Sequence, residues 1–186
     1  MSAPARAASV YEQFLAVPRH LVAEIINGTL VTQPRPAARH ARATSRLGNA
    51  LGGFDADGPE APGGWIILDE PELRLGDDIL VPDLAGWRRT RMPELPDVAA
   101  FELAPDWVCE VVSPSTQAID RADKLPIYAA AGVAHAWLVD PIAQTLEVFK
   151  LDAGRWVLLG THRGDACVRA EPFDAIELEL AALWAR

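Results

Sequence analysis

The amino-acid sequence predicts an α/β fold in which helices flank a mixed sheet and an added β-hairpin lies toward each end of the chain. Three observations lead to this prediction. Residues 107–112 (WVCEVV) form an almost wholly apolar run with one carboxylate in it, as in a central strand buried on both faces. Between residues 38 and 54, apolar side chains recur at three- and four-residue steps, which indicates a helix. Segments 23–33 and 145–161 each hold two strand-like runs around a turn sequence, Asn-Gly in the first and Asp-Ala-Gly in the second.

The other elements are predicted from apolar patterns bounded by turn residues. A short helix covers 10–17, and a longer one covers 116–131 with Gly132 as its C-terminal cap. Pro126 lies within the longer helix, so that either the helix is kinked or its regular part begins near Lys124. A brief helix is expected last. The remaining strands are predicted at 65–68, 72–75, 79–88, 134–139, 166–168 and 176–180.

Chain length and composition predict one domain. With 186 residues, of which half are hydrophobic, the chain is long enough to bury a core. Residues 1–9 are predicted to form a disordered tail and residues 10–186 a single domain, because no linker divides the sequence. No apolar run approaches the roughly 18–20 residues that a membrane span requires, and the N-terminal residues lack the apolar region of a secretory signal. We therefore expect a cytoplasmic protein without a membrane partner.

The overall charge argues against a protein that binds a phosphate backbone through net attraction. The formal net charge is −9 at pH 7, which disfavours non-specific binding to nucleic acid. Positive charge is nevertheless concentrated in short groups, which leaves a local basic groove possible. The largest of these groups consists of Arg35, Arg39, His40, Arg42 and Arg46.

Three charged residues occupy positions that an ordinary protein would fill differently. Glu110 interrupts the apolar run and, on a strand, shares a face with Val108 and Val112. A buried ionised carboxylate is unfavourable unless it is paired, hydrogen-bonded or bound to a metal. Asp83 lies in the strand-like segment VPDLAGW, and Lys124 lies on the helix that follows Glu110. Two carboxylates and an ammonium group offer oxygen ligands for Mg²⁺ or Mn²⁺ and a positive charge for a phosphate, as hydrolysis of a phosphodiester requires.

The most informative stretch of the chain is PDWVCEVVSPST followed by AIDRADKLPIYAAAGVAHAWLVDP. Further characteristic segments are AEIINGTLV, PRPAARH and VPDLAGW. Together they closely resemble the Uma2-like (DUF820) family of restriction-endonuclease-like proteins, which belong to the PD-(D/E)XK nuclease superfamily. The resemblance runs from about residue 22 to 180, and its most specific part is EVVSPST with Asp120, Arg121 and Lys124 after it. It implies a restriction-endonuclease-like fold.

The resemblance also implies roles for five residues. Asp83 corresponds to the "PD" metal ligand, and Glu110 to the second metal-binding carboxylate. The superfamily pattern expects lysine two residues after that glutamate, where this chain has valine. The catalytic lysine is instead Lys124 on the helix, as in other members of the family. Glu24 and His40 match positions that often carry Glu and His, so the predicted catalytic set is Asp83, Glu110, Lys124, Glu24 and His40, with Asp83 and Glu110 binding the metal.

Each of these residues also has an ordinary structural explanation. Asp83 follows a proline and could simply begin a turn, whereas Glu110 could face solvent on an edge strand. Lys124 could be a surface lysine paired with the aspartate four residues before it. Glu24 could be a solvated hairpin carboxylate. His40 could cap a helix at the surface, or it could contact a phosphate.

Two hypotheses of function follow. The first is a divalent-metal-dependent endonuclease that acts on nucleic acid, with DNA as the expected substrate and a homodimer expected by analogy with other nucleases. Lys124 would position the attacking water or stabilise the phosphate. We expect Asp83 and Glu110 to converge on one ion and at least one of them to have a raised pKa, because adjacent carboxylates repel each other. The second hypothesis, which the net charge favours, is a non-catalytic nucleic-acid-binding or regulatory interaction protein that retains the fold.

Overall fold

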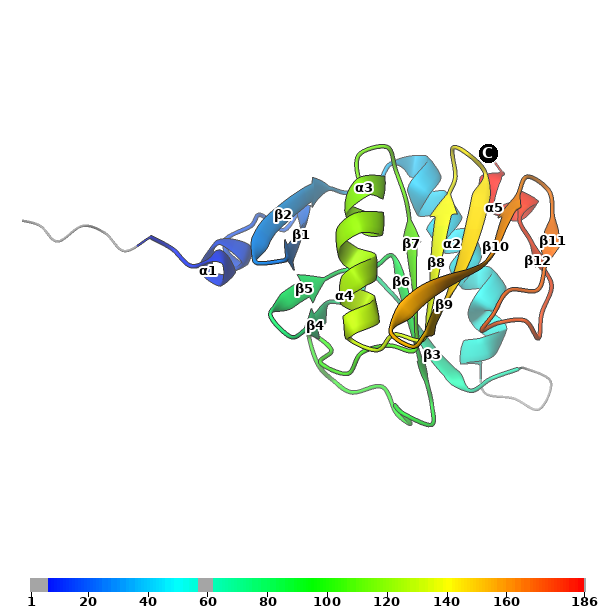
Figure 1. Ribbon diagram of the computed structural model, residues 1–186. Coiled ribbons are helices and arrows are strands. Elements are labelled where there is room, and N and C mark those ends of the chain that lie inside the picture. The colour runs from blue at the N-terminus through cyan, green and yellow to red at the C-terminus, as the bar shows by residue number, and fades with distance from the viewer. Residues whose placement is uncertain (1–6, 57–61, 186) are drawn as a thin grey trace, which may run out of the picture.

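A six-stranded mixed sheet occupies the centre of the computed structural model, which describes residues 7–56 and 62–185 (Figure 1). The strand order is β10-β9-β8-β7-β6-β3. β7 and β8 run parallel, and a helical segment joins them, whereas the other neighbours in this sheet are antiparallel. The strands are β3 (Trp65–Asp69), β6 (Leu84–Arg88), β7 (Trp107–Val111), β8 (His135–Asp140), β9 (Thr145–Asp152) and β10 (Arg155–Arg163).

A second sheet of four strands is built around the predicted N-terminal hairpin. Asn27 and Gly28 form its turn with φ angles of 51° and 74°, the positive values that a tight I′ turn needs. Two further strands extend this hairpin into a sheet with the order β2-β1-β5-β4. The predicted hairpins are confirmed, and β11 pairs with β12 near the C-terminal end. The strands are β1 (Leu21–Ile26), β2 (Thr29–Pro34), β4 (Leu73–Leu75), β5 (Asp78–Leu80), β11 (Cys167–Val168) and β12 (Leu178–Glu179).

The single strand predicted at 79–88 is wrong. This segment forms two strands, β5 and β6, which belong to different sheets. Pro82 lies between them, and a residue without an N–H group cannot donate to the ladder of a central strand. The chain therefore passes from the small sheet to the large one at residues 81–83, and Asp83 lies at this passage.

Helices cover both faces of the central sheet (Figure 1). The predicted helix at 38–54 is confirmed as α2 on one face, and the segment predicted at 116–131 is helical on the other. Its interruption is not a proline kink but a π-helical turn, η1, after which Pro126 stands in the first turn of α4, where a missing N–H is harmless. The helices are α1 (Val10–Leu15), α2 (Ala38–Asp55), α3 (Gln117–Ile119), η1 (Asp120–Lys124), α4 (Leu125–Ala130) and α5 (Ala181–Trp184).

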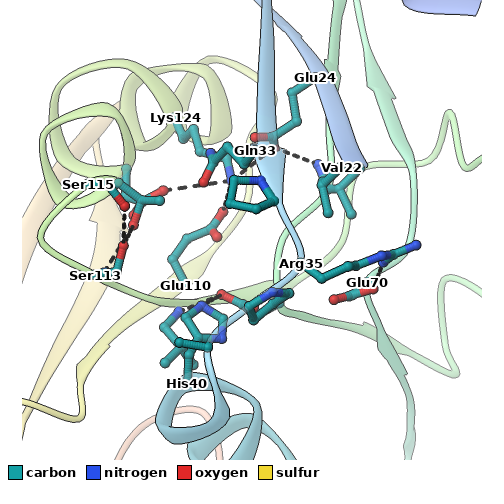
Figure 2. Close-up of a pocket in the computed structure, with 18 of the residues that line it drawn as sticks. Val22, Glu24, Gln33, Arg35, His40, Glu70, Glu110, Ser113, Ser115 and Lys124 are labelled. Carbon is teal, nitrogen blue, oxygen red and sulfur yellow. Dashed lines mark hydrogen bonds and ion pairs between the residues drawn. The ribbon is translucent and has the colours of Figure 1, made fainter. Parts of the chain in front are cut away.

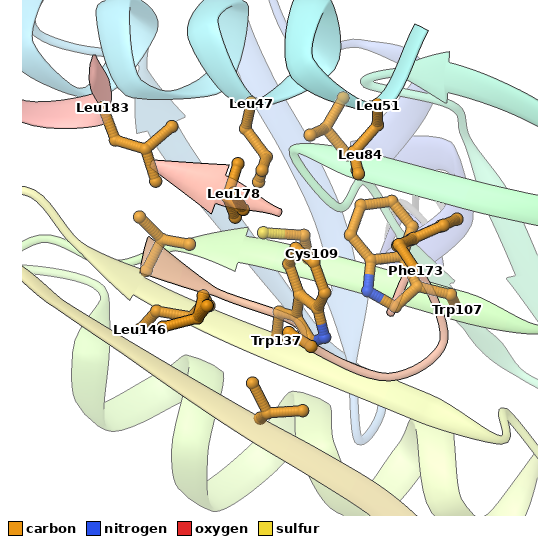
Figure 3. Close-up of a cluster of buried hydrophobic side chains, with 14 of the residues drawn as sticks. Leu47, Leu51, Leu84, Trp107, Cys109, Trp137, Leu146, Phe173, Leu178 and Leu183 are labelled. Carbon is orange, nitrogen blue, oxygen red and sulfur yellow. The ribbon is translucent and has the colours of Figure 1, made fainter. Parts of the chain in front are cut away.

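Strand β7 is buried on both faces, as its apolar sequence predicts. Cys109 faces the core beneath α2, toward which Leu47 of that helix points (Figure 3). Val108 and Val112 belong to the core on the other face, beneath α4. Because side chains alternate along a strand, Glu110 points to the same side as these two valines. A carboxylate is thus carried into the interior beneath the helix that bears Lys124.

The start of the chain is only partly within the described residues. Ser9 caps α1 through a capping box with Glu12, which explains why the short helix begins there. Residues 1–6 of the predicted disordered tail lie outside the described part, and the prediction of one domain over 10–186 stays a prediction. Among the described helices, none has the length and apolar character needed to cross a bilayer.

Candidate active site

Asp83 and Glu110 are brought together by the register of β6 and β7. The two strands pair Leu84 with Cys109, and one further step of this antiparallel register places Asp83 opposite Glu110. Residues opposite each other on antiparallel strands point to the same face. The Oδ2 atom of Asp83 also accepts the backbone N–H of Val111 at 2.7 Å, which fixes the carboxylate beside the end of β7.

Lys124 lies at the centre of a buried cluster of charged groups. Its Nζ atom is 2.9 Å from Glu24 Oε1 and 2.9 Å from Glu110 Oε1, and it is 3.7 Å from Asp120 Oδ1. Glu24 is held in turn by the backbone N–H of Val81 at 2.8 Å. These four charged residues are only 2–3% exposed, so the ordinary explanations of Glu24, Glu110 and Lys124 as solvated surface groups are wrong.

Tyr128 is a member of the cluster that the sequence analysis did not identify. Its buried hydroxyl donates a hydrogen bond of 2.6 Å to Glu110 Oε1. A signal was available, because Asp120, Lys124 and Tyr128 are spaced four residues apart. In a regular α-helix such residues drift around the axis by about 40° at each step. The wider turn of η1 reduces this drift: Lys124 and Tyr128 both contact Glu110, and Asp120 lies beside Lys124.

His40 reaches the site from the first turn of α2. Its Nε2 atom lies 3.3 Å from Asp83 Oδ2, and its Nδ1 atom is buried without a hydrogen-bond partner among the described residues. Burial lowers the pKa of His40, but the hydrogen bond to Asp83 and the negative charges of Asp83 and Asp120 outweigh it, and the pKa is raised above its usual value. His40 is therefore positioned to act on Asp83, and its explanation as a surface cap is wrong.

The electrostatics of the cluster are those of an acidic site with too few cations. Burial raises the pKa of Glu110 well above its usual value, and the Lys124 ammonium opposes this only in part. Burial also raises the pKa of Asp120. The pKa of Lys124 is itself raised, because Glu110, Glu24 and Asp120 outweigh the effect of burial, and it is a firmly protonated ammonium. The expected raised carboxylate pKa is confirmed, although burial rather than mutual repulsion is its main cause.

All five residues predicted to be catalytic line one pocket of about 400 Å³ (Figure 2). Among the described residues, the polar contacts of Asp83 fall on Oδ2 and those of Glu110 on Oε1. One oxygen of each carboxylate is therefore left for a ligand. No group of three or more His, Cys, Asp or Glu side chains in the described residues is arranged to hold a metal unaided. The donor set fits a hard cation such as Mg²⁺, which keeps several waters and commonly takes one or two protein carboxylates.

The SPST sequence, residues 113–116, follows β7 and forms part of the pocket wall. The Ser113 hydroxyl lies 3.0 Å from the Ser115 hydroxyl and 3.1 Å from that of Thr116. Thr116 is the N-cap of α3, and its side chain makes no capping hydrogen bond. Its hydroxyl accepts the backbone N–H of Ser113 instead. The segment thus folds back on itself and closes the pocket at the end of β7.

Comparisons with known proteins identify the family and the fold. The model of the Uma2 family, described as "Putative restriction endonuclease", matches residues 11–182. Five chains of solved structures match, among them a crystal structure described as a putative nuclease belonging to DUF820 from Anabaena variabilis. That chain is 22% identical, with a TM-score of 0.74 over 96% of this chain and 98% of its own length. No curated protein matches. The structural likeness shows the fold, and the predicted fold class is confirmed.

Proposed function

This chain belongs to the Uma2 family, and we propose that it is a divalent-metal-dependent endonuclease that hydrolyses phosphodiester bonds of DNA. One observation carries the proposal. Asp83, directly before β6, lies one register step beyond the Leu84–Cys109 pair and thus beside Glu110 of β7; both line the same pocket, and each keeps one oxygen without a protein partner in the described residues. Five carboxylates line the pocket, compared with the three basic side chains of Lys124, Arg35 and His40, and this excess of acidic groups favours a divalent cation.

Asp83 and Glu110 would hold Mg²⁺ or Mn²⁺ through these free oxygens. When bound, the metal supplies Lewis acidity toward the phosphate and lowers the pKa of water. Val111 and His40 fix the orientation of Asp83, and Tyr128 fixes that of Glu110. Such bonds restrict each carboxylate to one geometry before a ligand arrives, which reduces the reorganisation that binding requires.

Lys124 would supply a fixed positive charge beside the scissile phosphate. Glu24 and Glu110 each lie 2.9 Å from its Nζ atom, so that the ammonium cannot move freely. A preorganised cation in a pocket shielded from water stabilises the charge that develops on a phosphate. Glu24 acts by positioning Lys124, and His40 acts by positioning Asp83. DNA as substrate and a homodimer that cuts both strands belong to the same proposal.

Two measurements test the proposal together. Calorimetry should show Mg²⁺ or Mn²⁺ binding to the wild type and its loss in Asp83→Ala and Glu110→Ala, because each substitution removes a ligand. Cleavage of single- and double-stranded substrates at low salt should require the metal, stop with EDTA and disappear in both variants. Asp152→Ala, which removes an exposed carboxylate at the β9–β10 turn, serves as the matched control.

The rival function is a non-catalytic nucleic-acid-binding or regulatory protein. Two features favour it, namely the net charge of −9 and the contacts of the Lys124 ammonium with three protein carboxylates. If the wild type binds no divalent metal and cleaves no substrate faster than Glu110→Ala does, the endonuclease proposal is wrong and the non-catalytic function replaces it.

A further inference from the structure

A second cavity lies beside the candidate active site, at the same edge of the central sheet. β7 and β8 are parallel with Val111 beside Val139, so that their carboxyl ends reach this edge together. The residues directly after β7 line the active-site pocket. Pro141 and Ile142, directly after β8, line the second cavity, whose volume is about 510 Å³. The carboxyl ends of strands are where open α/β sheets bind their ligands.

The first turns of α2 form the wall between the two cavities. Ala37 and His40 line the active-site pocket, whereas Arg39 and Arg42 line the second cavity. Neighbouring residues on a helix point in different directions, so that His40 and Arg39 lie in the same turn but line different cavities. The two cavities are therefore adjacent parts of one surface.

The second cavity is positively charged, unlike the protein as a whole. Arg39 and Arg42 are exposed, and their side chains form no ion pair or hydrogen bond within the part of the chain that the structure describes. Arg46, one turn further along the same side of α2, is unpaired in the same sense. No Asp or Glu is among the described residues that line the cavity. In a chain of net charge −9, such a group is suited to an anionic ligand.

Apolar groups form the opposite side of this cavity. Ile142 is 58% exposed at the turn after β8. The indole of Trp184 is held in place by its Nε1–H, which donates to the backbone carbonyl of Gly164 at 2.7 Å. Arginines suit phosphate oxygens, and apolar or aromatic groups suit a sugar or a base. The cavity thus combines the two kinds of contact that a nucleotide needs.

We propose that the second cavity binds a nucleotide of the substrate strand next to the scissile phosphate. Arg39 and Arg42 contact its phosphate, and Ile142 and Trp184 contact its sugar or base. The strand crosses the start of α2 on its way from the active-site pocket. This inference rests on the proposed nuclease function and adds the path of the substrate to it.

Binding of fluorescent oligonucleotides in EDTA, single- and double-stranded and at several salt concentrations, tests the inference without cleavage. Arg39→Ala and Arg42→Ala should each weaken binding several-fold and reduce the slope of log K against log salt by about 1, because each removes a phosphate contact. Ile142→Asp should also weaken binding, since it places a carboxylate in the cavity. Arg155→Ala is the matched control, because Arg155 is an exposed arginine at the opposite end of the sheet, beyond the β9–β10 turn.

Thermal unfolding of each variant checks its fold, and alanine at these exposed helical positions should not destabilise the protein. The inference is overturned if both arginine variants bind with the affinity and the salt slope of the wild type. It is also overturned if the wild type binds no oligonucleotide. If cleavage requires metal but oligonucleotide binding is unchanged in Arg39→Ala and Arg42→Ala, this inference is overturned and the proposed activity is not. Binding that depends on both arginines, without cleavage under any metal, overturns the proposed activity alone.

Discussion

The hydroxyl of Tyr128 donates a hydrogen bond of 2.6 Å to Oε1 of Glu110, and both side chains are buried beneath α4. This bond leaves Oε2 of Glu110 as the oxygen available to a cation. Tyr128 is therefore a positioning residue that acts through Glu110. It has no direct part in binding the metal.

Tyr128→Phe should weaken metal binding by about 10–100-fold, the usual effect of removing a group that orients a metal ligand. The loss of one buried hydrogen bond should also lower the free energy of unfolding by about 1–3 kcal/mol. Calorimetry with Mn²⁺ and chemical denaturation measure the two effects separately. Tyr11→Phe is the control, because Tyr11 is exposed on α1. An unchanged metal affinity in Tyr128→Phe would contradict the positioning role.

Metal affinity should decrease as pH falls, because only ionised Glu110 can bind a cation. Burial raises the pKa of Glu110 well above its usual value, so the loss should begin at a higher pH than for an exposed carboxylate, whose pKa is about 4.3. Calorimetric titrations across a series of buffers would locate the midpoint. A midpoint at or below the value for an exposed glutamate would show that Glu110 does not control binding.

The same raised pKa predicts how stability depends on pH without metal. A carboxyl group whose pKa is higher in the folded state binds more protons there than in the unfolded chain. Its contribution to stability is complete below the unfolded pKa and is lost as pH rises through the folded pKa. Glu110→Gln stays neutral and keeps an oxygen that can accept from Lys124 and Tyr128. We therefore expect this variant to lose less stability than the wild type over that pH range.

Thermal unfolding of the metal-free proteins at several pH values tests this prediction, with Glu147→Gln as a control at a carboxylate outside the buried cluster. The Glu110→Gln variant should also lose metal binding, since its amide replaces a charged ligand. A variant that loses more stability than the wild type as pH rises would show that ionised Glu110 stabilises the fold through Lys124.

Removal of Lys124 should destabilise the metal-free protein strongly. Lys124→Ala leaves Glu24, Glu110 and Asp120 buried without their cation, and breaking a buried ion pair in this way costs about 3–5 kcal/mol. A divalent cation would restore part of the missing positive charge. The rise in melting temperature on adding Mg²⁺ should therefore be larger for this variant than for the wild type.

Lys150→Ala is the matched control for this experiment, because Lys150 forms an exposed pair with Glu171 that is worth at most about 1 kcal/mol. Lys124→Arg should not restore full cleavage, since a planar guanidinium does not replace a compact ammonium at a fixed point. Equal stability of Lys124→Ala and Lys150→Ala would show that the buried carboxylates do not depend on Lys124.

Much of the fold could be predicted because its signals are local. Asn27 and Gly28 accept the positive φ angles of a tight turn, and the apolar spacing along α2 marks the face that packs on the sheet. The unbroken apolar run of β7 requires cover on both faces, which predicts a central strand. Glu110 could be singled out for the same reason, because a carboxylate in such a strand needs a partner.

Other features depended on contacts between distant segments. Pro82 indicates that a strand is interrupted at this position. No residue near it indicates that β5 pairs with the N-terminal hairpin while β6 belongs to the central sheet. A hairpin carboxylate is usually solvated, so nothing near Glu24 in the sequence places it in the interior. It belongs to the site because β1 lies beside Lys124, with 2.9 Å between the charged atoms.

By itself, the sequence determined most of the strands, turns and helices and which of their charged residues are unusual, because periodicity and turn chemistry act over a few residues. The tertiary structure alone decided that the register of β6 and β7 sets Asp83 opposite Glu110, that Tyr128 orients Glu110, and that Arg39 faces a second cavity. A local pattern states which face of an element is buried. It does not state which distant element covers that face, since this is set by the packing of the whole chain.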